Sequence, residues 1–186
     1  MSRRLLLIFL ALATLGLGAC GDDEVETVTK GESEAVYVTL GDVQYQVQLS
    51  RQLNRFDAGD RDLLAGVPDA ERRLAPDEIW FGVWLRAQNG TEVPQGLADE
   101  FVIKDTIGGE FKPVAMTPES PFAYRPVEVA PGEVYPVVQS ASGQAPTTGA
   151  LLLFKMPVRT LDFRPLEFEF GSSELPGKAS SVRLDV

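Results

Sequence analysis

Cys20 is the residue whose type and setting point most directly to chemistry. It is the single cysteine among 186 residues, and it directly follows Leu17-Gly18-Ala19. Ahead of it lie a basic pair, Arg3-Arg4, and an apolar run from Leu5 to Leu17. A basic region, a short apolar region and small residues at the cleavage point are typical of a secretory signal peptide. The pattern predicts cleavage between Ala19 and Cys20 and attachment of diacylglycerol to the cysteine sulfur.

Two alternatives to this anchor are open. The first is an ordinary cleaved signal followed by a chance cysteine, and the second is a retained membrane anchor. The apolar run is short for a span, which needs about 20 apolar residues. We therefore expect an extracytoplasmic protein, held by lipid on Cys20 at the outer face of the bacterial cytoplasmic membrane.

The rest of the chain lacks two of the usual catalytic side chains, histidine and a free cysteine, and leaves carboxylates, lysines, tyrosines and hydroxyls. It contains no histidine, which excludes Ser-His-Asp and Cys-His machinery and imidazole metal sites. The one thiol is used by the predicted anchor, so no second cysteine remains for a nucleophile or a disulfide. We expect a protein that is not an enzyme and has no cofactor.

Three aspartates, Asp57, Asp60 and Asp62, gather around Gly59 and could suggest a calcium loop. An EF-hand needs its glycine at the sixth position and a later bidentate glutamate, and this spacing departs from that pattern. The cluster instead predicts a solvated loop with a helix cap, and we expect no metal site.

The charge of the chain limits its partners. The formal net charge is −10, and cleavage before Cys20 would remove Arg3 and Arg4 and leave −12. An acidic surface argues against nucleic acid and against electrostatic adhesion to anionic lipid head groups. The expected partners are the membrane, through the lipid, and an unknown protein of the cell envelope.

The elements that must position any site follow a period of two. We expect a signal peptide over 1–19, the lipidated cysteine and a flexible acidic tether over 20–34, and one domain over 35–186. Short alternating strands separated by turns predict an all-β antiparallel sandwich. The predicted strands are 36–40, 43–49, 79–88, 101–105, 110–112, 134–139, 150–156, 165–170 and 182–186. The predicted core includes Val47, Phe81, Val83, Leu85, Ile103, Leu153 and Phe168.

The stretch from Arg51 to Glu78 breaks this rhythm. Asp60 predicts the cap of one helical turn and Asp69 the cap of another, while Glu71 and Arg72-Arg73 predict an exposed turn. The stretch is a long connection, helical at most in part.

Trp80 and Trp84 share one face of the strand 79–88, about 13 Å apart. They could form a partner platform, because aromatic residues dominate binding hot spots. The preferred interpretation is that the stretch 51–78 folds over them, since exposed apolar patches are uncommon on soluble domains.

Several motifs together resemble a known group: the segments 50–54, 79–89, 101–111, 131–133 and 153–157, placed after a lipidation motif and an acidic tether. They resemble bacterial lipoproteins that carry an immunoglobulin-like domain of unknown function, related to immunoprotective extracellular antigens. The resemblance implies an immunoglobulin-like sandwich and carries over no active-site residue.

Three hypotheses for function follow. The first is a non-catalytic binding module anchored by lipid, with Trp80 and Trp84 as its possible partner surface. The second is a structural or scaffold lipoprotein of an envelope complex. The third is a carboxylate-dependent hydrolase of cell-wall glycan, which is disfavoured because no acid pair lies beside an apolar stretch that would raise one pKa.

Overall fold

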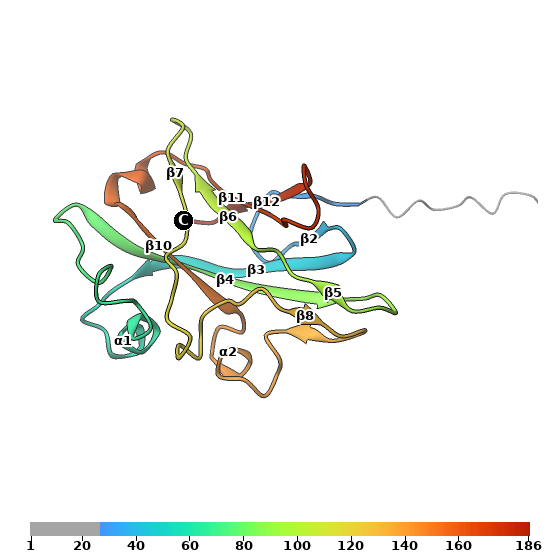
Figure 1. Cartoon of the computed structure of the whole chain (residues 1–186). Helices are drawn as coiled ribbons and strands as arrows, with labels where there is room; N and C mark the ends of the chain where they lie inside the picture. Colours follow the sequence, from blue (N-terminus) through green and yellow to red (C-terminus); the bar gives the residue numbers. More distant parts are fainter. Residues whose placement is uncertain (1–26) are drawn as a thin grey trace, which may run out of the picture.

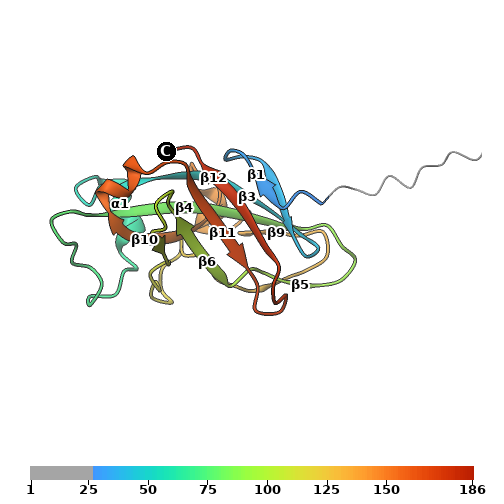
Figure 2. The ribbon, with the colours of Figure 1, turned by 90° about the horizontal axis from the view of Figure 1, so that it is seen from above.

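A computed structural model describes residues 27–186, so the predicted lipidation and cleavage sites, Cys20 and Ala19, lie outside the described residues. The chain forms two β-sheets packed face to face (Figures 1 and 2). No helix within 27–186 is long and apolar enough to cross a membrane. The prediction of an all-β antiparallel sandwich is confirmed.

The first sheet has the order β1 (Lys30–Gly31), β12 (Ala179–Leu184), β11 (Leu166–Gly171), β6 (Glu100–Lys104) and β7 (Glu110–Phe111). The second has the order β10 (Ala150–Pro157), β4 (Glu78–Asn89), β3 (Val43–Leu53) and β2 (Tyr37–Leu40), and β9 (Val134–Tyr135) also pairs with β4. Strands β5 (Gln95–Gly96) and β8 (Glu128–Val129) form a separate pair. The helices are α1 (Ala58–Leu64), α2 (Ala141–Gln144) and the 3₁₀-helix η1 (Val158–Asp162).

The main core lies between the two sheets. Aromatic rings from opposite sheets meet there, with Phe154 and Phe168 at 6.2 Å between centroids and Tyr45 and Phe170 at 4.9 Å. All seven predicted core residues are buried. Six of them belong to this core, but Leu153 points to the other face of its sheet. All seven residues were therefore correctly predicted to be buried, but the sequence did not predict that Leu153 packs in a second core.

Two buried tyrosines hold the backbone of Ala98, where the chain passes from β5 to β6. The Ala98 N–H donates to the Tyr45 hydroxyl at 2.8 Å, and the Tyr124 hydroxyl donates to the Ala98 carbonyl at 2.9 Å. Burial raises the pKa of Tyr45 to about 12 and also raises the pKa of Tyr124. Burial thus favours the neutral form of both phenols in the folded state.

This pair predicts a loss of stability at alkaline pH. The unfolded chain releases the Tyr45 proton near pH 10, whereas the folded chain holds it to about pH 12. Stability is therefore complete below pH 10 and falls as pH rises toward 12, by about 1.4 kcal/mol per pH unit for each such group. Urea unfolding at pH 8, 10, 11 and 12 measures this. Tyr45→Phe should reduce the slope above pH 10, and an unchanged slope would contradict the assignment.

The predicted tether boundary at residue 34 is wrong, because residues 28–34 belong to the sandwich. The Val28 carbonyl accepts from the Thr39 N–H at 2.7 Å, and β1 pairs in parallel with β12. The Glu34 carboxylate accepts from the N–H groups of Ser50 and Asp185, at 3.0 and 3.2 Å. Backbone and carboxylate hydrogen bonds dock this segment, so it carries no apolar period that a sequence could reveal.

Two details of the stretch 51–78 also differ from expectation. Asp57, not Asp60, caps α1, through bonds to the N–H groups of Gly59 and Asp60. The residues after Asp69 form a turn and no helix, and β3 continues to Leu53. The predicted strand 134–139 ends at Tyr135.

Candidate functional site

A second core covers the outer face of the second sheet. Trp80 and Trp84 are each 3% exposed there, on the face of β4 opposite Phe81 and Val83. Their neighbours come from three parts of the chain: Leu53, Val67, Met116, Ala123, Leu151 and Leu153. Strand β4 is thus buried on both faces. The interpretation of burial agrees with this packing, and the indoles do not form an open platform.

Two segments cover this face. The stretch 51–78 does so as expected, with Val67 buried and Leu63, Leu64 and Leu74 packed against the cluster. The segment 114–123 does so unexpectedly, through Met116, Ala123 and their neighbours. This segment is a loop that runs over the outer face of the second sheet. The Thr117 N–H donates to the Gly66 carbonyl at 2.8 Å and joins the two covering segments.

Gly82 makes room for the Trp84 indole. A Cβ atom at residue 82 would lie 2.9 Å from two atoms of that ring and 3.0 Å from a Leu151 methyl. The Trp84 ring therefore lies directly over Gly82, which separates the two tryptophans along β4. This close contact fixes the Trp84 side chain in the second core.

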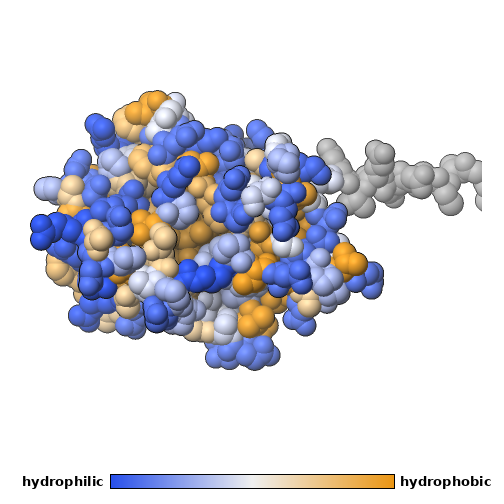
Figure 3. Space-filling model, viewed as in Figure 1, coloured by the Kyte–Doolittle hydropathy of each residue, from blue (hydrophilic) through white to orange (hydrophobic). Residues whose placement is uncertain are grey.

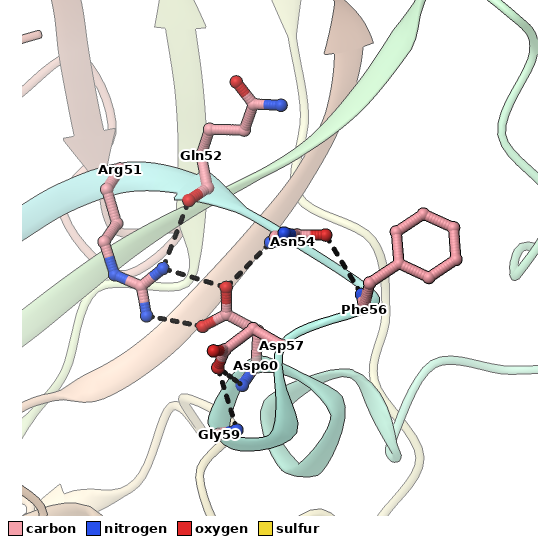
Figure 4. Close-up of polar contacts among 7 residues, drawn as sticks. All are labelled: Arg51, Gln52, Asn54, Phe56, Asp57, Gly59 and Asp60. Atoms are coloured by element: carbon pink, nitrogen blue, oxygen red, sulfur yellow. Dashed lines mark hydrogen bonds and ion pairs between the residues drawn. The ribbon is translucent and has the colours of Figure 1, made fainter.

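An ion pair fastens α1 to the sheet (Figure 4). The Arg51 guanidinium donates to both carboxylate oxygens of Asp60, at 2.6 and 3.1 Å, and lies 5.2 Å from the centre of the Trp84 ring. The Asn54 N–H donates to the same carboxylate at 2.7 Å. The Arg51 guanidinium lowers the pKa of Asp60. A carboxylate predicted as a helix cap instead holds the helix in place.

Asp60→Asn should destabilise the protein by about 1–3 kcal/mol at pH 7, because hydrogen bonds to charged groups contribute that much. The pKa of Asp60 is lowered in the folded state, so its stabilisation is present above the unfolded value near 3.9 and is lost as pH falls through the folded value. Urea unfolding at pH 7 and pH 3 should show the deficit of the variant shrinking in acid. Asp62→Asn, an exposed change on the same helix, is the control. Equal effects of the two variants would contradict the assignment.

A groove of about 590 Å³ opens beside α1, and we name it the arginine groove. Its lining holds three arginines, four apolar residues and no carboxylate: Arg55, Arg61, Arg72, Leu64, Ala65, Val67 and Trp80. The arginines are exposed, whereas Val67 and Trp80 are buried and form its floor. Pockets of roughly 300–1,000 Å³ with an apolar lining and a few polar groups are the usual form of ligand sites.

A second hollow of about 360 Å³ adjoins the groove and shares Arg55 and Trp80 with it. Phe56 lies in its lining and is 77% exposed, the most exposed of the large apolar residues within 27–186. The Arg55 guanidinium stacks 4.8 Å from the centre of the Phe56 ring. Binding hot spots are enriched in aromatic residues and arginine, so this corner is the best candidate contact surface.

The outer face of the first sheet has two hollows of a different kind, of about 620 and 270 Å³. Charges of both signs line them and neutralise each other, as in the ion pairs of Lys104 with Glu169 at 2.9 Å and of Arg183 with Glu32 at 2.5 Å. In the view of Figure 1, hydrophilic side chains cover most of the surface, and apolar ones form separate spots (Figure 3). The outer face of the first sheet, with its paired charges, is typical of a sheet face in contact with solvent.

The carboxyl groups give little support for acid catalysis. The carboxyls within 27–186 whose pKa shifts clearly are Asp60, Asp99 and Glu119, and each shifts downward. A general acid needs a raised pKa. Residues 27–186 contain no group of three or more potential metal ligands. Asp57 and Asp60 are instead bonded to backbone N–H groups and to Arg51.

Comparison with known proteins adds little to this picture. No family model matches the chain, and no curated protein matches its sequence. Among solved structures, the yjhA protein of Bacillus subtilis is 10% identical over 83% of this chain and 99% of its own, with a TM-score of 0.47. A candidate lipoprotein of Bacillus subtilis, ycdA, is 10% identical over 82% of this chain and 39% of its own, with a TM-score of 0.42. An uncharacterized β-sandwich protein of Clostridium difficile is 9% identical over 83% and 95%, with a TM-score of 0.45. Likenesses this distant carry no argument, so the fold assignment rests on the strands of the chain itself.

Proposed function

We propose that this protein is a non-catalytic binding module, anchored by lipid on Cys20 at the outer face of the cytoplasmic membrane. The observation that carries the proposal is the arginine groove with its apolar floor, placed beside α1. Its combination of convergent cations and apolar surface suits binding, and its lining holds no carboxylate for acid or base chemistry. We also propose kinship with the immunoglobulin-like lipoproteins that the motifs resemble.

The position of the groove fits this role. Strand β1 and helix α1 lie toward opposite ends of the sandwich (Figures 1 and 2). Seven residues separate Cys20 from Val28, the first residue bonded to the sandwich. The eight residue steps from Cys20 to Val28, at 3.3–3.6 Å each, reach at most about 29 Å. A lipid on Cys20 would thus keep the β1 end near the membrane and turn the groove outward.

The anchor is tested by Cys20→Ala. Each buried CH₂ of a lipid chain contributes about 0.8 kcal/mol to membrane binding, so loss of the lipid should release the domain or stall its precursor without unfolding it. Cell fractionation in high salt measures the release. A Cys20→Ala chain that is processed normally and still pellets with membranes would contradict a lipid-only anchor.

The binding role is tested by photocrosslinking in intact cells. A photoreactive phenylalanine analogue replaces Ala65 in the groove or, as the control, exposed Ile107 in the turn between β6 and β7. We expect one discrete adduct from residue 65, none from residue 107, and loss of the adduct when Arg61→Glu is added. No adduct from residue 65, or adducts from residue 107 alone, would overturn the proposed surface.

A further inference from the structure

We propose that the arginine groove takes an extended segment of a partner protein in which acidic residues flank an apolar side chain. This inference rests on the proposed function and names the class of ligand. It follows from three features of the groove: its charge, its floor and its continuation into the neighbouring hollow.

The charge of the groove is opposite to that of the chain. The whole sequence carries a net charge of −10, yet the lining has three guanidinium groups and no acid. Arg55 and Arg61 form no ion pair with any residue of 27–186, whereas Arg72 pairs with Asp69 at 2.9 Å. Arg72 also donates to the Val67 carbonyl at 2.9 Å, which holds it over the floor. Planar guanidinium forks suit carboxylates, which accept two parallel bonds.

The floor distinguishes a peptide from a hydrophilic polyanion. Four of the lining residues are apolar: Leu64, Ala65, Val67 and Trp80. Val67 and Trp80 are already buried at the bottom of the groove, so the apolar surface open to a ligand comes from Leu64 and Ala65. A polyphosphate chain would satisfy the arginines and leave this surface without contacts. An acidic segment that carries a leucine or an aromatic residue would contact both the arginines and the apolar surface. Burial of apolar area would then add to the ionic contacts.

The shape favours an extended segment. The neighbouring hollow shares Arg55 and Trp80 with the groove and continues to Phe56, Leu74 and Pro76. Its lining also holds Glu78, whose carboxylate accepts from the Ala75 N–H at 2.7 Å, so this hollow suits the apolar residue of the segment and the groove suits the acidic ones. The two hollows together form a path along the stretch 51–78. An extended segment of several residues would place successive side chains in the two hollows.

The acidic residues before Val28 of the same chain do not reach this path. Asp22 lies six residues before Val28, which allows at most about 22 Å. Val28 is bonded to Thr39, which pairs with Gln44, and Leu53 lies nine residues further along β3, about 30 Å. The N-terminal residues of the same molecule are therefore not the occupant, and the proposed occupant is a segment of a separate partner molecule.

The test is a selection of peptides on the full chain, purified with its lipid in detergent. A displayed library of random twelve-residue peptides is selected on the wild type, on Arg61→Glu and on Arg159→Glu. Arg61 and Arg159 each lie in the last turn of a short helix, but Arg159 is outside the groove. Both are exposed, so both variants should fold, which circular dichroism and thermal melting check.

We expect acidic peptides with one or two leucine or aromatic residues from the wild type and from Arg159→Glu. Arg61→Glu should lose these sequences and favour less acidic or basic ones. By fluorescence anisotropy, a selected peptide should bind Arg61→Glu or Arg55→Glu at least tenfold more weakly, and a version with serine in place of its apolar residues should also lose at least tenfold.

Three results would overturn the inference. They are enrichment of the same peptides on the wild type and Arg61→Glu, absence of acidic enrichment, and tighter binding of inorganic polyphosphate or of phosphatidylglycerol vesicles than of any selected peptide. If the groove still gave its crosslink in cells, the binding role would stand and the ligand class alone would fall.

Discussion

Trp84→Ala should lower the free energy of unfolding by about 3–5 kcal/mol, the usual cost of emptying a buried aromatic site. The indole is 3% exposed and lies between Gly82 and the covering segments. Its removal also takes away the ring beneath the Arg51 guanidinium. For a domain of this size the melting temperature should fall by about 6–20 °C, which thermal denaturation followed by circular dichroism measures.

Phe56→Ala is the matched control, because it removes an aromatic ring that is largely exposed. Its effect on unfolding should be within about 0.5 kcal/mol. The two variants also separate packing from binding: Trp84→Ala should cost mainly stability, and Phe56→Ala mainly affinity for a selected peptide. A Trp84→Ala protein with normal stability and lost binding would restore the platform hypothesis.

Phe81→Ala should cost a similar 3–5 kcal/mol, through the main core rather than the second one. The ring is fully buried between the sheets. Total domain stability is about 5–15 kcal/mol, so this variant should unfold at much lower urea concentration than the wild type. Equilibrium urea unfolding at pH 7 measures the change.

The control for Phe81 is Gln44→Ala on the outer face of β3, where the side chain is exposed. It should hardly move the transition. Gln46→Ala is a less clean control than the alternation alone indicates, because the Gln46 amide donates to the Ala35 carbonyl at 2.6 Å. Equal losses from Phe81→Ala and Gln44→Ala would mean that the register of these strands is wrong.

The strands and their inward faces were predictable because burial of one face imposes a period of two. The hairpin of β2 and β3 turns at Gly41, whose φ of 60° suits glycine. The hairpin of β6 and β7 turns at Gly108, with φ of 89°. Local residue choice decides such turns. Strand β4 is apolar on both faces, and this pattern predicted that another segment of the chain covers its tryptophans.

Other parts of the fold leave no such trace. The segment 114–123 covers the tryptophans because the Thr117 N–H bonds to the Gly66 carbonyl and because Ser120 packs closely against Gly66. The docking of residues 28–34 depends on parallel pairing and on the Glu34 carboxylate. Contacts of this kind join residues far apart in the chain, and no local pattern encodes their partners.

The location of the candidate site was predictable from the sequence, but the residues that line it were not. The stretch 51–78 and the tryptophan face were the expected location. The three groove arginines are spaced 6 and 11 residues apart in the stretch 51–78, a spacing that fits no single helix face or strand face, and Arg72 was expected simply in an exposed turn. Only the folding of α1 against Arg51 brings Arg55, Arg61 and Arg72 around one floor. A useful signal would have been arginines recurring among the leucines of an otherwise acidic chain.

The pairing of β1 with β12 has a mechanical consequence. With Cys20 held in a bilayer and a partner held in the groove, any pulling force on the molecule enters through residues 28–34. The links that bear it, in chain order, are the bond of Val28 with Thr39, the short β1 ladder and the bonds of Glu34. Their rupture would release seven residues, about 25 Å of extra chain, while both cores stayed closed. Under load, residues 28–34 would thus detach and lengthen the connection to the membrane before the two sheets of the sandwich separate.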